Sequence, residues 1–217
     1  MKSPWLKHFI WAVLGLALGA GMALLQGRGS VPANTKVATV SETKSIPAPA
    51  TVSGVQIGGA FSLVDQTGKP VTEKSWPEKY KLVFFGFTHC PDTCPATLQK
   101  LSAVMDHFDS KGDKIVPLFV TVDPARDNAA VMAKYVAAFN PHIVGLTGTE
   151  EQIKAMEGTY KVYAAKQPGQ SNNDYAEYME DHSAYVYLMS PDDKLLQTFS
   201  FDETAENMIA KIKESVK

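Results

Sequence analysis

Residues 81–95 read KLVFFGFTHCPDTCP, and this stretch decides the fold. The apolar run at 81–87 is typical of a strand that is buried on both faces. Cys90 and Cys94, the two cysteines of the chain, follow the run, and each is directly followed by a proline. Proline disfavours helical backbone in the residue before it, so no regular helix should run through the pair. We therefore expect an irregular turn, with Pro95 in the first turn of a helix.

Strands and helices alternate along the rest of the chain. The spacing of Leu98, Leu101 and Met105 predicts a helix directly after the turn. Further strands are expected at 61–64, 70–72, 115–122, 142–146, 184–189 and 195–201, and further helices at 128–139, 149–160 and 204–216. This order predicts an α/β domain of three layers, α/β/α, around a mixed central sheet. The polar segment 166–181 fits neither periodicity and is predicted to be a long loop.

Composition narrows the function class. The chain has 217 residues, a formal net charge of -2 and 45% hydrophobic residues, so most of it should be globular. No block of Lys or Arg is present that would follow a phosphate backbone, which excludes a nucleic-acid binder. Two cysteines cannot make a disulfide scaffold, but they can make one functional pair.

The first residues are predicted to lie outside the globular domain. Residues 9–25 are apolar and uncharged, after Lys2 and Lys7, and are just long enough to span a bilayer. They fit either a signal peptide cleaved near Ala23 or an uncleaved signal-anchor. The run is longer than a usual signal-peptide core of roughly 7–15 residues, which favours the anchor.

The predicted organisation has four parts. These are a cytoplasmic N-terminus at 1–8, a transmembrane signal-anchor at 9–25, a flexible tether at 26–55 and the globular domain at 56–217. The positive flank of the anchor should stay in the cytoplasm, with the domain on the other side. The N-terminus has no Arg-rich transit peptide, so we expect a bacterial inner membrane, a single pass and a periplasmic domain.

Two thiols at the start of a helix allow two kinds of chemistry. They can cycle between dithiol and disulfide, or they can supply two soft donors to Cu(I) or Zn(II). A helix N-terminus stabilises a thiolate, so both thiols are expected to ionise more readily than ordinary cysteine. Two thiolates alone leave a metal ion under-coordinated, so a metal site needs a third ligand.

The five histidines of the chain are the candidates for that ligand. His89 adjoins Cys90 but would point away from it if the pleat of the strand continued. His107 and His142 are expected to be ordinary surface or core residues. His182 lies at the end of the predicted loop and directly before a strand, and sequence spacing alone cannot place it near the cysteines.

Three motifs together resemble the Sco/SenC family: GFTHCPDTCP at 86–95, VTVDPARD at 120–127, and DHS at 181–183 before a strand. Members of that family are membrane-tethered, thioredoxin-like copper proteins that help to assemble cytochrome c oxidase. The resemblance implies a thioredoxin-like fold for 56–217. It also implies that Cys90, Cys94 and His182 bind copper, as Cu(I) and as Cu(II).

The function that this resemblance implies is copper delivery. The protein would be a metallochaperone for the dinuclear copper site of cytochrome c oxidase subunit II, working with other periplasmic copper chaperones or thiol reductants. The alternative is a membrane-tethered thiol-disulfide reductase that keeps the cysteines of that subunit reduced. The reductase needs Cys90 and Cys94 as a redox pair but not His182, and whether the protein is an enzyme stays open between the two.

The VTVDPARD motif has two interpretations. It can dock a partner or support the copper-binding turn. It can also be a structural turn with an internal Arg–Asp pair between Arg126 and Asp123 or Asp127, which we favour at this stage.

Overall fold

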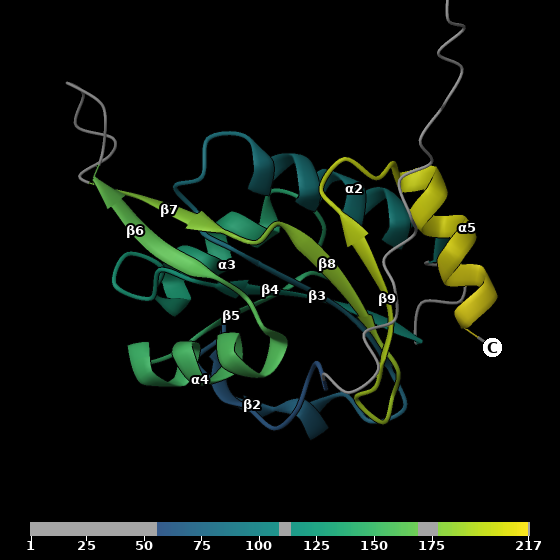
Figure 1. Ribbon diagram of the computed structural model, residues 1–217, viewed down its shortest axis with the longest axis horizontal. Helices are drawn as coiled ribbons and strands as arrows, with labels where there is room; N and C mark the ends of the chain where they lie inside the picture. The colour runs from purple at the N-terminus through teal and green to yellow at the C-terminus, as the bar shows by residue number, and fades with distance from the viewer. Residues whose placement is uncertain (1–55, 109–113, 169–177, 217) are drawn as a thin grey trace, which may run out of the picture. The chain divides into compact units, whose positions relative to one another are not determined.

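The computed structural model describes residues 56–108, 114–168 and 178–216 (Figure 1). The predicted anchor at 9–25 and tether at 26–55 lie outside the described residues. Within the described ranges, no helix has both the length and the apolar character needed to cross a membrane.

A seven-stranded mixed sheet forms the centre of the described domain, in the order β2-β1-β5-β4-β3-β8-β9. Its strands are β1 (Ser62–Asp65), β2 (Pro70–Thr72), β3 (Tyr80–Gly86), β4 (Ile115–Thr121), β5 (Val144–Thr147), β8 (Tyr185–Met189) and β9 (Leu195–Ser200). β3, β4 and β5 run parallel, and the other pairs are antiparallel. β3 and β4 lie inside the sheet and are buried almost throughout, which explains their unbroken apolar sequence.

Helices cover both faces of the sheet. They are α2 (Thr93–Phe108), α3 (Ala129–Ala137), α4 (Glu150–Tyr160) and α5 (Ala205–Ser215), with a short 3-10 helix, η1 (Glu73–Ser75). Successive strand residues point to opposite faces. Phe84 stacks on Phe119 with ring centroids 5.9 Å apart, on the face that α3 covers through the 5.6 Å contact between Phe119 and Tyr135. Phe85 packs on the other face against Tyr160 of α4, at 5.3 Å.

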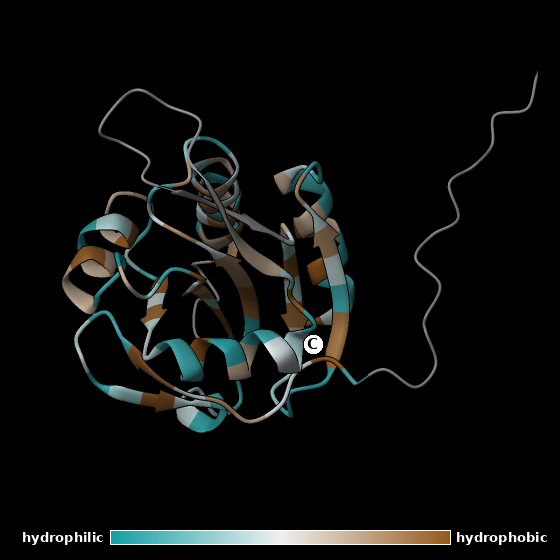
Figure 2. Cartoon of the chain, turned by 60° about the vertical axis from the view of Figure 1, so that its left-hand side comes forward, coloured by the Kyte–Doolittle hydropathy of each residue, from teal (hydrophilic) through white to brown (hydrophobic). Residues whose placement is uncertain are grey.

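These layers confirm the predicted α/β class with a mixed central sheet. Each predicted strand and helix is present, and its ends lie within two residues of the expected positions. Hydrophobic residues concentrate on the central strands, whereas the helices alternate between hydrophobic and hydrophilic positions (Figure 2). The start of α4 is fixed by a capping box, in which Thr149 Oγ1 accepts from Gln152 N and Gln152 Oε1 accepts from Thr149 N.

The predicted loop at 166–181 is wrong at both ends. β6 (Ala164–Pro168) and β7 (Tyr178–His182) pair as an antiparallel ribbon, with Ala164 opposite His182. Both strands are rich in polar residues, so they lack the apolar alternation from which a strand is predicted. Backbone hydrogen bonds between two such segments need no apolar side chains.

The segments that carry the sequence motifs lie at one edge of the sheet, where the parallel strands end. Because β3, β4 and β5 are parallel, their carboxyl ends lie at the same edge. β8 runs antiparallel to β3, so its first residues lie at that edge as well. The cysteine turn, the VTVDPARD motif and the end of β7 all adjoin it.

The opposite edge carries a buried ion pair that yields a stability prediction. Lys81 Nζ lies 2.5 Å from Asp193 Oδ1, with side-chain exposures of 1% and 23%. The substitution Asp193→Asn leaves a buried ammonium group without its counter-charge. We expect it to lower the free energy of unfolding by about 2–4 kcal/mol, measured by urea denaturation. The matched control is Asp192→Asn in the same turn, whose partner Lys194 is exposed, and a loss as large in this control would contradict the assignment.

Candidate metal centre

The two cysteines lie on a turn that links β3 to α2. The backbone N–H of Cys90 donates to the carbonyl of Phe87 at 3.3 Å, which closes the turn. α2 begins at Thr93, so Cys94 and Pro95 are its second and third residues. The expected irregular turn with Pro95 in the first helical turn is confirmed. The helix, however, already includes Cys94.

The two thiols have different environments. Cys94 is completely buried, and Cys90 is half-buried against the same core. The backbone N–H of Cys94 donates to Cys90 Sγ at 3.4 Å, which favours a negative charge on that sulfur. The pKa of Cys94 is raised, first by its side-chain hydrogen bond with Cys90 and then by burial. The expectation that both thiols ionise readily is therefore wrong for Cys94, because these two effects outweigh the helix N-terminus.

Gly86 makes room for the buried sulfur. A Cβ atom at this position would lie 2.6 Å from Cys94 Sγ and 2.8 Å from Phe119 Cε2. Atoms cannot approach so closely, so a residue with a side chain at this point would displace the thiol or the ring. This role could not be predicted from the sequence, because the requirement arises from the packing of α2 on β3.

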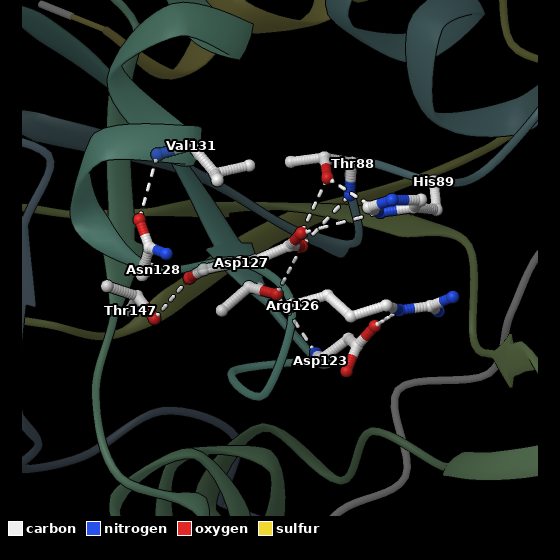
Figure 3. Close-up of polar contacts among 9 residues, drawn as sticks. Thr88, His89, Asp123, Arg126, Asp127, Asn128, Val131 and Thr147 are labelled. Atoms are coloured by element: carbon white, nitrogen blue, oxygen red, sulfur yellow. Dashed lines mark hydrogen bonds and ion pairs between the residues drawn. The ribbon is translucent and has the colours of Figure 1, made fainter.

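A buried carboxylate fixes the start of the cysteine turn (Figure 3). Asp127 is fully buried and accepts three hydrogen bonds, from Thr88 N at 2.9 Å, Thr88 Oγ1 at 2.5 Å and Thr121 Oγ1 at 2.7 Å. Thr88 lies two residues before Cys90, and Thr121 ends β4. Sequence reasoning missed Thr88 and Thr121. The acidic motif directly after a buried strand was the signal that pointed to this edge.

The VTVDPARD motif contains the predicted ion pair and also holds the start of the cysteine turn. Arg126 Nε donates to Asp123, which is the predicted internal ion pair, and the guanidinium carbon lies 6.0 Å from the ring centroid of Phe87. Asp127 performs the other role, because its side chain holds the turn that carries the cysteines. The motif therefore combines a structural turn with support of the cysteine pair.

His182 is the last residue of β7, three residues before β8 begins. Phe84 of β3 lies opposite Val186 of β8. Because β8 begins beside the end of β3 that leads into the cysteine turn, the topology places the segment that follows His182 at that edge, which sequence spacing could not predict. Among the side chains that the structure describes, no group of three or more His, Cys, Asp and Glu is placed to hold a metal.

The other described histidines divide into two kinds. His107 is exposed in the last turn of α2, and His142 is exposed before β5, in accordance with the prediction that both are ordinary residues. His89 differs, because the strand pleat ends before it and Thr88 and His89 form a turn. Its Nδ1 lies 3.1 Å from Thr88 Oγ1 and 3.9 Å from Asp127 Oδ1.

Tyr135 of α3 is a further residue that the sequence did not indicate. Its hydroxyl group is buried and its ring lies 5.6 Å from that of Phe119, which also borders Cys94. Burial raises the pKa of this phenol, and its electrostatic interactions with Cys94, Cys90 and Asp127 raise it further. On the side covered by α3, the surroundings of the cysteines are aromatic, with Phe119 and Tyr135 next to each other.

A family model and individual relatives of this chain indicate the same family. A family model described as SCO1/SenC matches residues 49–217. Protein sco1 of Schizosaccharomyces pombe is 43% identical over 164 residues, which are 75% of this chain and 62% of that protein. The mitochondrial SCO1 homologue of Homo sapiens is 35% identical over 204 residues, which are 93% of this chain and 65% of that protein. The chain thus spans less than two thirds of the length of these relatives.

Solved structures give the same fold. The structure of Bradyrhizobium japonicum ScoI with copper bound has a TM-score of 0.66 and 41% sequence identity, covering 73% of this chain and 98% of that one. The crystal structure of Arabidopsis thaliana ScoI with copper bound also has a TM-score of 0.66, with 38% identity, covering 73% of this chain and 99% of that one.

The packing at Gly86 leads to a prediction with an internal control. Gly86→Ala should displace Cys94 Sγ or Phe119 and lower the free energy of unfolding by about 1–3 kcal/mol. Gly158→Ala makes the same change in α4 where no atom lies within 4 Å, and should raise it by about 0.5–1 kcal/mol. Urea denaturation of both variants tests the pair. Equal effects of the two substitutions would show that the space at Gly86 is not limiting.

The different environments of the thiols predict different reactivities. In the copper-free, reduced protein at pH 7–8, iodoacetamide should modify Cys90 at least about tenfold faster than Cys94. The thiolate of Cys94 is scarce at this pH, because its pKa is raised above the ordinary value, and its sulfur is buried. Peptide mapping by mass spectrometry measures both rates, and the denatured protein is the control in which they should converge. Equal rates in the native protein would contradict the assignment.

Proposed function

This chain belongs to the SCO1/SenC family, and we propose that it is a copper metallochaperone for the assembly of cytochrome c oxidase. The target would be the dinuclear copper site of subunit II. The observation that carries the proposal is the cysteine pair on a turn fixed by Asp127, in which the backbone N–H of Cys94 donates to Cys90 Sγ at 3.4 Å. Two soft sulfur donors held together in this way suit copper.

We propose Cys90, Cys94 and His182 as the ligands. The ScoI proteins of Bradyrhizobium japonicum and Arabidopsis thaliana, which share this fold, have structures with copper bound. Two thiolates and a neutral imidazole give a net charge of -1 with Cu(I) and 0 with Cu(II). Neither charge is prohibitive near a protein surface, so the set can accept both oxidation states. The N–H of Cys94 that donates to Cys90 Sγ supports the thiolate at that position.

Delivery would proceed by ligand exchange between docked proteins. A thiolate of the partner forms a bond to copper as a bond to one of the ligands of this chain breaks, and the metal keeps its oxidation state. Cys90 is the more accessible sulfur and Cys94 the buried one, so exchange would begin at Cys90. The released Cys90 thiolate then takes a proton from water.

The second candidate is thiol-disulfide reduction. It is favoured by the same turn, since two free cysteines in contact through Cys94 N and Cys90 Sγ can cycle between dithiol and disulfide. A disulfide between Cys90 and Cys94 would remove both sulfur ligands, so the two activities exclude each other at any one time. The proposed setting for either is the periplasmic side of a bacterial inner membrane, with 9–25 as anchor and 26–55 as tether.

The substitution His182→Ala separates the two functions. Loss of a hydrogen-bond partner of a ligand already costs 10–100-fold in metal affinity, so loss of the ligand itself should cost about 100-fold or more for Cu(I) and Cu(II). Chelator competition measures the affinity. The dithiol should remain oxidisable to a disulfide, which mass spectrometry detects.

His107→Ala is the matched control, because His107 is exposed in the last turn of the helix that begins with the cysteines. A His182→Ala variant that binds copper as tightly as the parent would exclude the three-ligand site. One that loses copper but still supports oxidase assembly in cells would favour the reductase.

A further inference from the structure

We propose that His89 is a second imidazole ligand of the copper site, which binds copper through Nε2 while the metal enters or leaves the cysteine pair. The inference rests on the proposed function, because it concerns the route by which the cargo reaches Cys90 and Cys94. It arises from the hydrogen bonds around His89 (Figure 3).

The hydrogen-bond chain assigns the proton on the ring. A hydroxyl group has one hydrogen to donate, and that of Thr88 lies 2.5 Å from Asp127 Oδ1, a carboxylate oxygen that can only accept. Thr88 Oγ1 therefore accepts at its other contact, which is His89 Nδ1 at 3.1 Å. It follows that Nδ1 carries the hydrogen and that Nε2 of the neutral ring carries the lone pair.

This arrangement is the one that metal-binding histidines use. Such histidines donate the hydrogen of one ring nitrogen to a carboxylate or another acceptor, which fixes the ring and makes the other nitrogen a better ligand. In this chain, Thr88 and the buried Asp127 form the accepting chain. The side chain of His89 is 41% exposed, so the ring is accessible from outside while its Nδ1 side is held.

The position of His89 ties it to the sulfurs. Thr88 and His89 are the two central residues of the turn closed by Cys90 N and Phe87 O. His89 is thus bonded directly to Cys90, the more accessible of the two cysteines. Asp127 also accepts from the backbone N–H of Thr88, so the segment that carries the imidazole is anchored through backbone and side chain.

A second imidazole has a defined use in transfer. Copper arriving from a donor can form its bond to His89 Nε2 as a bond to the donor breaks, before both sulfurs are engaged. The thiol protons then leave to solvent as the sulfurs bind, and no electron moves. His182 replaces His89 in the stored complex, and the order reverses on release.

Pulsed electron paramagnetic resonance of bound Cu(II) tests the ligand. The samples are the full-length, tag-free protein in detergent, loaded with equimolar Cu(II). His182→Ala should still show the remote nitrogen of one imidazole, and His182→Ala with His89→Ala should show none. The control His182→Ala with His107→Ala should match His182→Ala alone. An absent imidazole signal in His182→Ala, or one that survives loss of His89, overturns the proposal.

These spectra keep the two proposals apart. If His182→Ala binds copper as tightly as the parent, the stored three-ligand site fails, whatever His89 does. If His182→Ala loses affinity and shows no imidazole signal, the stored site stands and the role of His89 fails.

The rate of Cu(I) release tests the transfer step. Release to excess bicinchoninate should be about tenfold slower in His89→Ala than in the parent, and Thr88→Val should be intermediate because it removes the acceptor that fixes the ring. Equilibrium Cu(I) affinity should change less than about threefold in His89→Ala, since the stored site does not use His89. His107→Ala should release Cu(I) at the parental rate. An unchanged rate in His89→Ala overturns the role in transfer.

Discussion

The buried carboxylate of Asp127 is the constraint on which this site depends. Its carboxylate oxygens accept from Thr88, two residues after the end of β3, and from Thr121, at the end of β4, while its backbone carbonyl accepts from Thr147 Oγ1 of β5 at 2.7 Å. One residue therefore joins the carboxyl ends of three parallel strands. A buried carboxylate that loses its donors costs several kcal/mol, so the three strand ends and the cysteine turn are held as a unit.

That unit gives the two sulfurs unequal roles. Cys94 is packed between β3 and α2, in space that exists because position 86 has no side chain. Cys90 lies further out, and its sulfur accepts the backbone N–H at the start of the helix. In the proposed carrier, one sulfur would hold the metal and the other would exchange, and the turn supplies both sulfurs from positions four residues apart. The same closeness permits a disulfide, so the geometry alone does not separate storage of copper from thiol chemistry.

Features that depend on neighbouring residues in the sequence could be predicted, whereas features that depend on contacts between distant residues could not. The buried strands and capped helices were predicted because their signals are local: unbroken apolar runs, and Thr149 with Gln152 three residues on. The ribbon of β6 and β7 was missed because paired polar segments carry no apolar period. The bond between Thr88 and Asp127 joins residues 39 apart and requires the parallel register of β3 and β4, which no local pattern encodes. The prediction that Cys94 ionises readily was wrong for the same reason, since the burial of its thiol depends on the whole fold.

The proposed ligands lie on elements that are packed into the domain to different degrees. The cysteines lie on the central sheet and α2, among the most buried residues of the domain. His182 ends a strand that, among the strands described, pairs with β6 alone. A two-stranded ribbon is marginally stable by itself, so the backbone that carries His182 can shift with little effect on the core. With the proposed ligand set, a shift of this ribbon would weaken the hold on copper during exchange at Cys90 while the fold stays intact. That division suits a protein whose cargo must leave.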